Sequence, residues 1–461
     1  MTMKSTLSTK MRSLALMPVL GLAACATTTG NYTAPPPPKA LPSVQAAQLP
    51  MGTPSAVWWT QFNDERLDEL VALAWSANHD LKVAAERLAA AREGVAAAGA
   101  ARWPVIGIGS ANYYQREGGH GQSGTQVRGT VDLELDLFGR IGRAVDAARA
   151  DEGERAQLLE DARRLVLARV VETYLELRSA QQLRAVIVEQ LANQDSTLQL
   201  VKERVAAGSA APAERVRFEA QVRLTEARLP ALAAQERSAR NRLATLTGSA
   251  LDAPAIVRLD EAKGLALPDA LVTDEPAQLL RRRPDVAAAE RALAAAMSRE
   301  HLARMQFLPQ VSLSALLGGP RSFVQLLWVA TVVDGGARSA NVRGASAQVR
   351  AAAANYEKAI AVALEDADTA VSNWAHTRER LTKLEDAHRL AQESAGLARI
   401  RYREGAESLL GVLDTERTAL GAREQLVTAQ RDLAMAASRA YVAVAGGFDQ
   451  PTREVARASG G

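Results

Sequence analysis

The chain contains little of what a conventional globular core or a helical membrane protein uses. Its 461 residues include a single cysteine, Cys25, which excludes an intrachain disulfide and a metal cluster built on several cysteines. Aromatic residues make up only 4% of the chain, so alanine-rich helices packed side by side are the expected use of the apolar residues. Beyond the N-terminal leader no run of about eighteen apolar residues occurs, and no transmembrane helix is therefore predicted.

Net charge and catalytic motifs are also scarce. Three basic residues of the leader account for the formal charge of +3, because the other 52 bases match the 52 acids. A neutral chain lacks the basic face that a nucleic-acid partner requires. The five histidines show no ligand spacing, and neither a GxSxG elbow nor a P-loop lysine motif occurs. We therefore predict no metal site, no nucleic-acid partner and no enzymatic activity.

Two glycine- or arginine-rich segments are given structural interpretations. Residues 119–124 fit the pattern GxGxxG, but they precede a predicted strand rather than open a helix, which predicts an external loop over 117–124 and not a nucleotide site. Arg281, Arg282 and Arg283 precede Pro284. Because the residue before a proline disfavours helix, these arginines are expected to end one helix and face solvent.

The N-terminus has the features of an exported lipoprotein. Residues 1–24 combine a basic start with an apolar stretch and small residues at the end, which predicts a signal peptide. The sequence Leu22-Ala23-Ala24-Cys25 resembles a bacterial lipobox, which implies cleavage before Cys25, a diacylglycerol on its sulfur and a palmitoyl group on its new amino terminus. The alternative is a buried structural cysteine near an ordinary cleavage site. Residues 25–56 include four consecutive prolines and predict an extended lipidated tether.

Two short regions alternate between apolar and polar residues. In 130–137, Val131, Leu133, Leu135 and Leu137 alternate with threonine and carboxylates, which predicts a strand with one apolar and one charged face. The first strand pair is expected at about 105–138 and the second at about 310–333. At nine to eleven residues the strands have about the length that crosses a bilayer.

Long helices follow each strand pair. No proline occurs between Pro104 and Pro212 or between Pro320 and Pro451, and alanine, leucine, glutamate and arginine predominate there. About sixty helical residues would extend roughly 90 Å. One helix is expected over 213–247, kinked at Pro230.

The pattern occurs twice in the chain. Residues 285–309 repeat residues 80–104 at an offset of 205, and Arg401–Gly405 repeats Arg204–Gly208 at an offset of 197. The predicted organisation is therefore a tandem duplication. It comprises a first repeat over 57–250, a connection over 251–276, a second repeat over 277–447 and a C-terminal tail over 448–461.

Strands can cross a bilayer only when the sheet closes and leaves no free edge. Four strands from one chain are too few to enclose a useful pore, which suggests that several chains contribute to one barrel. Closure would place Asp132, Glu134 and Asp136 in a wet lumen and the apolar residues against lipid. The alternative is one half of a soluble sandwich.

Several motifs in this order resemble the outer-membrane factors of RND-type tripartite efflux pumps, in the lipoprotein branch that includes OprM-, TolC- and NodT-like proteins. They are the lipobox, the segments 136–140, 280–285 and 333–336, and residues 405–414. The resemblance implies a homotrimer in which four strands per protomer form an outer-membrane β-barrel. The barrel continues as a long α-helical coiled-coil barrel, so the fold class is mainly α with a small β part.

The resemblance also implies a gate at the two helix breaks, where a periplasmic membrane-fusion adaptor would meet the channel. The residues that match the family's periplasmic tip are Glu214, Arg217, Tyr402, Gly405, Glu407 and Asp414. Glu407 stands where some relatives have a gate arginine, and Gly411 where some have an aspartate. The alternative for the acidic residues is solvated charge near a helix end.

The expected function is that of a passive exit duct, anchored by lipid in the outer membrane and extending into the periplasm. Its implied partners are the adaptor, an inner-membrane RND transporter, outer-membrane lipid and two further copies of the chain. The alternatives are a structural coiled-coil envelope lipoprotein and the exit channel of a type I secretion system. The substrate is not predicted, because a wide aqueous duct has little chemical preference of its own.

Overall fold

The computed structural model describes residues 36, 38–55, 57–117, 120–260, 267–268, 271–318 and 322–444. Residues 37–461 belong to one unit. The signal peptide, Cys25 and the C-terminal tail lie outside the described residues. All elements named below belong to that unit.

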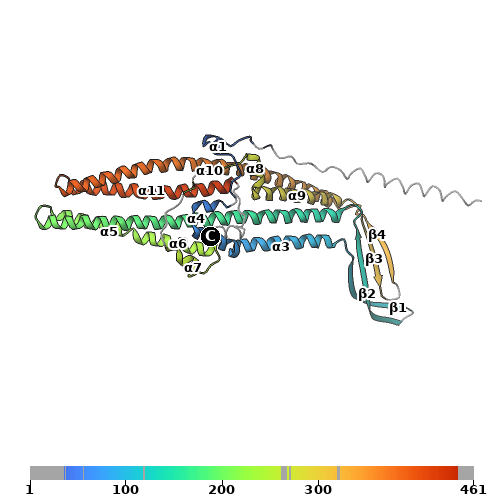
Figure 1. Ribbon diagram of the computed structural model, residues 1–461. Coiled ribbons are helices and arrows are strands. Elements are labelled where there is room, and N and C mark those ends of the chain that lie inside the picture. The colour runs from blue at the N-terminus through green and yellow to red at the C-terminus, as the bar shows by residue number, and fades with distance from the viewer. Residues whose placement is uncertain are drawn as a thin grey trace, which may run out of the picture. The chain divides into compact units, whose positions relative to one another are not determined.

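The helices occur as two equivalent sets (Figure 1). The first set comprises α2 (Glu65–Ala77), α3 (His79–Ala100), α4 (Arg140–Ala206), α5 (Pro212–Glu226) and α6 (Leu229–Leu246). The second set comprises α8 (Pro276–Arg282), α9 (Pro284–Met305), α10 (Ala337–Arg403) and α11 (Leu409–Ala443). The short elements are α1 (Pro42–Ala46), η2 (Trp58–Phe62), α7 (Pro254–Val257) and η3 (Arg258–Asp260).

The predicted duplication extends to the ends of individual helices. Helices α3 and α9 both have 22 residues and begin 205 positions apart, while α4 and α10 both have 67 residues and begin 197 positions apart. At 1.5 Å per residue, each of the two long helices extends about 100 Å. Each long helix therefore accounts for the whole length that the sequence predicted.

The predicted helix over 213–247 is wrong in one respect, because it is two helices rather than one kinked helix. Helix α5 ends at Glu226, and α6 begins at Leu229 with Pro230 in its first turn. A proline fits the first turn, where its missing N–H would have no partner, but not the helix interior. The chain therefore ends one helix and starts the next instead of bending.

The four strands form one antiparallel sheet in the order β1-β2-β3-β4. They are β1 (Val105–Glu117), β2 (His120–Leu135), β3 (Gln310–Leu317) and β4 (Phe323–Val329). The predicted loop over 117–124 is wrong from His120 onward, because 120–124 belong to β2 and pair with β1. The GxGxxG pattern is thus largely strand.

The strand ends also differ from the sequence-based ends. Strand β2 ends at Leu135 rather than 138, and β4 ends at Val329 rather than 333. The last pair of β3 and β4 is Gln310↔Val329, and Pro309 before it has no N–H to extend the ladder. Strands β3 and β4 therefore have eight and seven residues, fewer than the nine to eleven that a bilayer-crossing strand usually needs.

The largest apolar core lies where the two sets of helices meet midway along α4 and α10. Trp58 stacks on Tyr441 with ring centroids 5.4 Å apart, and Trp59 meets Trp75 edge to face at 5.0 Å. Buried side chains of α2, α4, α6, α10 and α11 surround this aromatic group. Four of the six tryptophans, Trp58, Trp59, Trp75 and Trp374, thus lie where the two repeats are joined.

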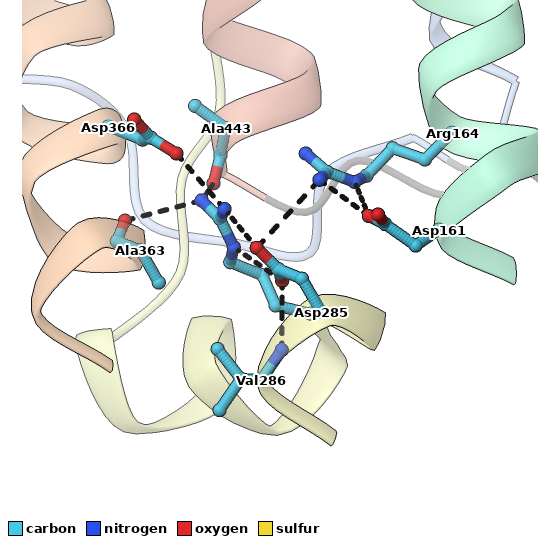
Figure 2. A network of polar contacts seen from close by, with 8 residues as sticks. Asp161, Arg164, Asp285, Val286, Ala363, Asp366 and Ala443 are labelled. Carbon is cyan, nitrogen blue, oxygen red and sulfur yellow. Dashed lines mark hydrogen bonds and ion pairs between the residues drawn. The ribbon is translucent and has the colours of Figure 1, made fainter. Parts of the chain in front are cut away.

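Arg283 lies inside this junction and not in solvent, so the prediction for that arginine is wrong. Figure 2 shows its partners Asp285, Ala363, Asp366 and Ala443 close together. Helix α8 does end at Arg282, as predicted, but the Arg283 side chain is only 1% exposed. Its guanidinium donates to both oxygens of Asp285, at 3.0 and 2.6 Å, and to Asp366 at 3.1 Å. It also donates to the carbonyls of Ala363 and Ala443, at 3.3 and 3.4 Å. Its five donors explain how an arginine can be buried here.

Candidate functional site

The sheet has one polar face, set by the register of its strands. Residues directly opposite each other in an antiparallel pair point to the same side. Asp132 lies opposite Ser314 and Glu134 opposite Ser312, and Gln325 follows across β4. The Ser314 hydroxyl donates to Asp132 Oδ1 at 2.7 Å. Asp132 and Glu134, two of the predicted lumen residues, therefore share one face with serine and glutamine. This face is polar over β2 and β3 but mixed on β4, where Leu327 lies opposite Ser312 and Phe323 opposite Leu316.

The opposite face is apolar and exposed in the single chain. Ile108 is 84% exposed, Leu326 is 66% and Trp328 is 68% exposed, although residues of this type normally avoid water. The apolar residues of this face come from all four strands: Ile106, Ile108, Val127, Val131, Leu133, Leu135, Val311, Leu313, Ala315, Leu317, Val324, Leu326 and Trp328. The predicted two-faced sheet is therefore present.

The third predicted lumen residue, Asp136, is outside the sheet. It follows the last residue of β2, and its two carboxylate oxygens accept from the N–H groups of Ile141 and Gly142, both at 3.0 Å. Glu134 lies on the strand but forms an ion pair with Arg140, whose Nε is 2.9 Å from Glu134 Oε1. Both carboxylates thus fix the angle at which α4 leaves β2, since N-terminal N–H groups and nearby anions stabilise each other.

Each edge of the sheet has an unused row of backbone groups. Within the described strands, β1 pairs only with β2 and β4 only with β3. Strand edges next to an apolar face are templates for further strands. The sheet is therefore suited to joining other copies edge to edge.

At the other end of the helices, the two predicted breaks are tight turns of the same type (Figure 1). Ser209 N–H donates to the carbonyl of Arg204 at 2.9 Å, and Ala406 N–H donates to the carbonyl of Arg401 at 2.8 Å. Gly208 and Gly405 have φ values of +70° and +79°, where other residues are strained. This arrangement is the Schellman motif, in which a glycine ends the helix. Gly405 therefore has a conformational role in the turn.

The two turns are held together by Arg204 and Tyr402. The Arg204 guanidinium lies 4.6 Å from the Tyr402 ring centroid, and its Nη1 donates to the Tyr402 carbonyl at 3.0 Å. A group of buried residues, named here the tip cluster, surrounds this contact: Val201, Phe218, Val222, Ala398, Tyr402, Leu409 and Val412. Burial raises the pKa of Tyr402, the nearby Arg204 lowers it in part, and Glu214 raises it again. Glu214 thus lies close enough to Tyr402 to affect the pKa of its hydroxyl.

The other tip candidates are spread around the turns. Glu407 Oε1 accepts from the N–H of Ser408 at 3.1 Å, and its side chain lies against Gly411, where a Cβ would collide with it. Arg217 is exposed on α5. Asp414 is exposed on α11 and pairs with Arg417 at 2.6 Å. Whether any of these residues gates a passage remains a prediction.

Arg204 was not among the predicted site residues. Its signal in the sequence was the repeat itself, because Arg204 and Arg401 occupy equivalent positions before the two turns. Only contact across the two repeats distinguishes them, since Arg204 reaches Tyr402 while Arg401 Nη2 reaches the carbonyl of Ala406 at 3.5 Å. The sequence alone could not reveal that difference.

A small sheet with an apolar and a polar face, continued by helical hairpins, is the architecture of an outer-membrane channel protein. A family model described as outer membrane efflux protein matches residues 70–249 and 276–446, which is more than half of the chain. The chain belongs to the outer membrane efflux protein family.

Individual relatives agree with this assignment. The pyoverdine export outer membrane protein OpmQ of Pseudomonas putida is 29% identical, over 96% of this chain and 99% of the relative. Nodulation protein T of Rhizobium leguminosarum bv. trifolii is 28% identical, over 85% and 88% of the two chains. The solved outer-membrane channel OprN has a TM-score of 0.85 and 30% identity, covering 92% of this chain and all of that one.

These comparisons confirm the resemblance, the mainly helical fold with its four-stranded sheet, the outer-membrane location and the role in efflux. OpmQ is named as an export outer membrane protein and OprN as an outer-membrane channel. Among the described residues, no helix combines the length and the apolar character needed to cross a bilayer.

Proposed function

We propose that three copies of this chain form an exit duct that passively conducts small molecules from the periplasm to the outside. The observation that carries the proposal is the strand register, which gives one open sheet a polar face and an exposed apolar face. In lipid such a sheet is stable only when closed, with its polar face toward water. Two copies would give an eight-stranded barrel whose interior side chains fill, whereas three copies leave an aqueous passage.

The long helices extend the duct beneath the sheet. Helices α4 and α10 each extend about 100 Å and end at the two turns joined by Arg204 and Tyr402. We place the closed end of the duct at these turns. There the candidates Glu214, Arg217, Tyr402, Gly405, Glu407 and Asp414 would meet the hairpins of a periplasmic adaptor, which an inner-membrane RND transporter supplies with cargo.

The lipid anchor is part of this proposal. Acylation of Cys25 with diacylglycerol and a palmitoyl group would fix the N-terminus in the outer membrane, because two or more chains give stable anchoring. Growth with a labelled fatty acid tests it. The wild-type chain should carry label and the Cys25→Ala chain should carry none; label on the variant would remove the anchor from the proposal.

Paired substitutions on the two faces of β4 test the duct. Leu326 belongs to the apolar face, and its neighbour Gln325 belongs to the polar face. Arginine on a lipid-facing strand position costs about 2–4 kcal/mol near the middle of the membrane, whereas a lumen position tolerates it. Leu326→Arg should therefore reduce the heat-sensitive trimer seen in unboiled samples, and Gln325→Arg should preserve it.

Conductance in planar bilayers completes the test. Gln325→Arg should form channels with altered ion selectivity, because its side chain would face the passage. Equal loss of trimer in both variants, or a wild-type chain that is monomeric and forms no channel, would refute the duct. A rod-like scaffold lipoprotein is the outcome that such a result would favour.

A further inference from the structure

A layer of polar side chains interrupts the apolar packing between the helical hairpins. The tip cluster lies on one side of it, and on the other lies a second apolar group of Val186, Ile187, Leu420 and Val427. Between them lies a cavity of about 340 Å³ with a mixed lining. Part of this lining is what we call the polar layer: Gln190, Gln194, Gln221, Thr225, Glu416 and Glu424. The remaining lining residues are Leu224, Arg228, Leu413, Arg417, Leu420 and Gly421. The packing between the hairpins therefore lacks the continuous apolar seam of an ordinary coiled coil.

Glu416 and Gln194 occupy core positions in this layer. Val412, Glu416 and Leu420 follow each other at steps of four on α11, which places them on one face of the helix. Ile187, Gln194 and Val201 follow each other at steps of seven on α4. Glu416 is 5% exposed and Gln194 is 2% exposed. Both are thus buried where a leucine or valine would be expected.

Hydrogen-bond donors are missing around these two side chains. Both carboxylate oxygens of Glu416 and Oε1 of Gln194 are buried without a hydrogen-bond partner among the described residues. The Thr197 hydroxyl lies beside Glu416 but donates to the carbonyl of Asn193 at 3.2 Å. An ionised carboxylate without donors is costly to bury, whereas a protonated one brings its own donor.

The neighbouring charges compensate only in part for a carboxylate at Glu416. Arg399 forms a long ion pair with it, in which Nε lies 3.9 Å from Oε1. Arg228 pairs with Glu424 at 2.6 Å, and Arg417 pairs with Asp414 at 2.6 Å. The charged and titratable groups that line the cavities on the two sides of Glu416 come from all the neighbouring helices: Glu189, Arg228, His388, Arg399, Arg417, Arg423 and Glu424.

We propose that Glu416 is a proton-binding group in the polar layer between the hairpins, and that binding a proton favours the closed arrangement of the tips. Opening would let water reach the polar layer, and a hydrated carboxylate releases its proton more readily than a buried one. By linkage, the state that binds the proton more tightly gains stability as the pH falls. Burial raises the pKa of Glu416, and Arg399 and Thr197 offset this only in part, which agrees in sign. The inference rests on the proposed function only in taking the turns as the closed end of the duct.

The experiment measures tip separation and thermal stability of the full-length trimer in detergent at about pH 5.5 and about pH 8.5. Spin labels at the turns, introduced through Ser209→Cys, report the distance between protomers. In the wild-type channel the tips should lie closer together at the lower pH. Glu416→Gln, which resembles the protonated carboxyl, should hold them close at both values. It should also remove a difference in Tm of at least about 3 °C between the two conditions.

Matched variants separate proton binding from a merely structural role. Glu424→Gln and His388→Gln alter titratable groups that line the same cavities, and both should keep the pH dependence. Glu416→Leu should remove the pH dependence and raise Tm, because it joins the two apolar groups. If Glu416→Gln and Glu416→Leu keep the wild-type pH dependence while remaining trimeric and conducting, the proposal is overturned and the duct is not. Loss of trimer and conductance in the wild type would instead overturn the duct.

Discussion

Replacing Arg283 by glutamine should weaken the junction of the two repeats more than any exposed arginine would. The guanidinium makes five hydrogen bonds, two of them to the carboxylate of Asp285 and two to main-chain carbonyls of α10 and α11. Glutamine is shorter and cannot reach all of these acceptors. Asp285 would keep the N–H of Val286, at 3.0 Å, and Arg164, whose Nη2 is 3.8 Å away.

The expected loss of unfolding free energy depends on which of these acceptors water cannot reach. Asp366 is half exposed, so solvent can replace its lost partner at little cost. The side chain of Asp285 is only 27% exposed, and the two carbonyls are each worth about 1 kcal/mol. Removing one partner from a buried ion pair costs about 3–5 kcal/mol, which is the loss we expect in total. At about 2 °C per kcal/mol for a chain of this size, Tm should fall by roughly 6–10 °C.

The assay is thermal unfolding of the trimer in detergent, with Arg282→Gln as the control. Arg282 is adjacent, is 33% exposed and pairs with Asp274 at 2.6 Å, so its removal should cost about 0–1 kcal/mol. Equal values of Tm for the two variants would refute the idea that the Arg283 network joins the repeats.

The pH dependence gives a second, independent check. Burial raises the pKa of Asp285, but the hydrogen bonds and charge of Arg283 outweigh burial and hold the pKa below its usual value. The carboxylate therefore stabilises the fold above a pH of about 4 and loses this contribution as the pH falls through the lowered pKa. In the Arg283→Gln variant the Asp285 carboxylate has lost its main partner, and protonation removes the cost of burying its charge. The difference in Tm between wild type and Arg283→Gln should therefore become smaller as the pH is lowered.

Two further predictions concern the ends of the long helices. Arg204→Ala removes the contact with the Tyr402 ring and the hydrogen bond to its carbonyl, worth about 1–2 kcal/mol together, and should increase leak conductance and sensitivity to a large antibiotic. Arg223→Ala, at an exposed position on α5 outside the tip candidates, is its control, and equal leak in both would place the closure elsewhere. Asp136→Ala removes the two bonds to Ile141 and Gly142 and should destabilise the start of α4 by about 1–2 kcal/mol. Faster hydrogen exchange in the first turn of α4 would report it, whereas Asp146→Ala, further along the same helix, should leave that turn protected.

The helices and the faces of the sheet were predictable because they depend on local patterns. Alternation in β2 gave the correct polar and apolar faces, and Gly208 and Gly405 marked the two turns. The ends of the strands depend instead on whether the neighbouring strand has residues that can pair with them. Val332 and Val333 continue the apolar run, but β3 has no partner for them beyond Pro309. Strand length was therefore overestimated.

Buried charge was the other feature that local reasoning missed. Arg283 was expected in solvent because it follows two arginines and precedes a proline, yet its acceptors come from α9, α10 and α11. The short segment around Glu416 contained a usable signal, since a glutamate falls between Val412 and Leu420 at steps of four. A polar residue at a core position is a pattern that sequence can supply. Its missing donors are visible only after the helices are packed.

In each repeat, a side chain that precedes one helix donates a hydrogen bond to the last carbonyl of another helix, but the side chains differ. In the first, Asn78 precedes α3 and its amide donates to the carbonyl of Leu246, the last residue of α6, at 2.7 Å. In the second, Arg283 precedes α9 and donates to the carbonyl of Ala443, the last residue of α11. Asn78 and Arg283 are 205 positions apart, and the two carbonyls are 197 apart, the same offsets that relate the helices.

The larger side chain of Arg283 explains why this residue of the second repeat also stabilises the junction between the repeats. The carbonyls at a helix end have no partner within the helix, so each repeat needs a donor to close it. Asn78 donates one hydrogen bond, to the carbonyl of Leu246 in its own repeat, and its Oδ1 accepts from the N–H of Leu81 at 3.0 Å, which caps α3. Arginine has five donors, enough to close its own repeat and to hold Asp285 within reach of Arg164 on α4. An Asn78→Ala change should therefore loosen only α3 and α6, whereas Arg283→Gln should loosen both repeats together.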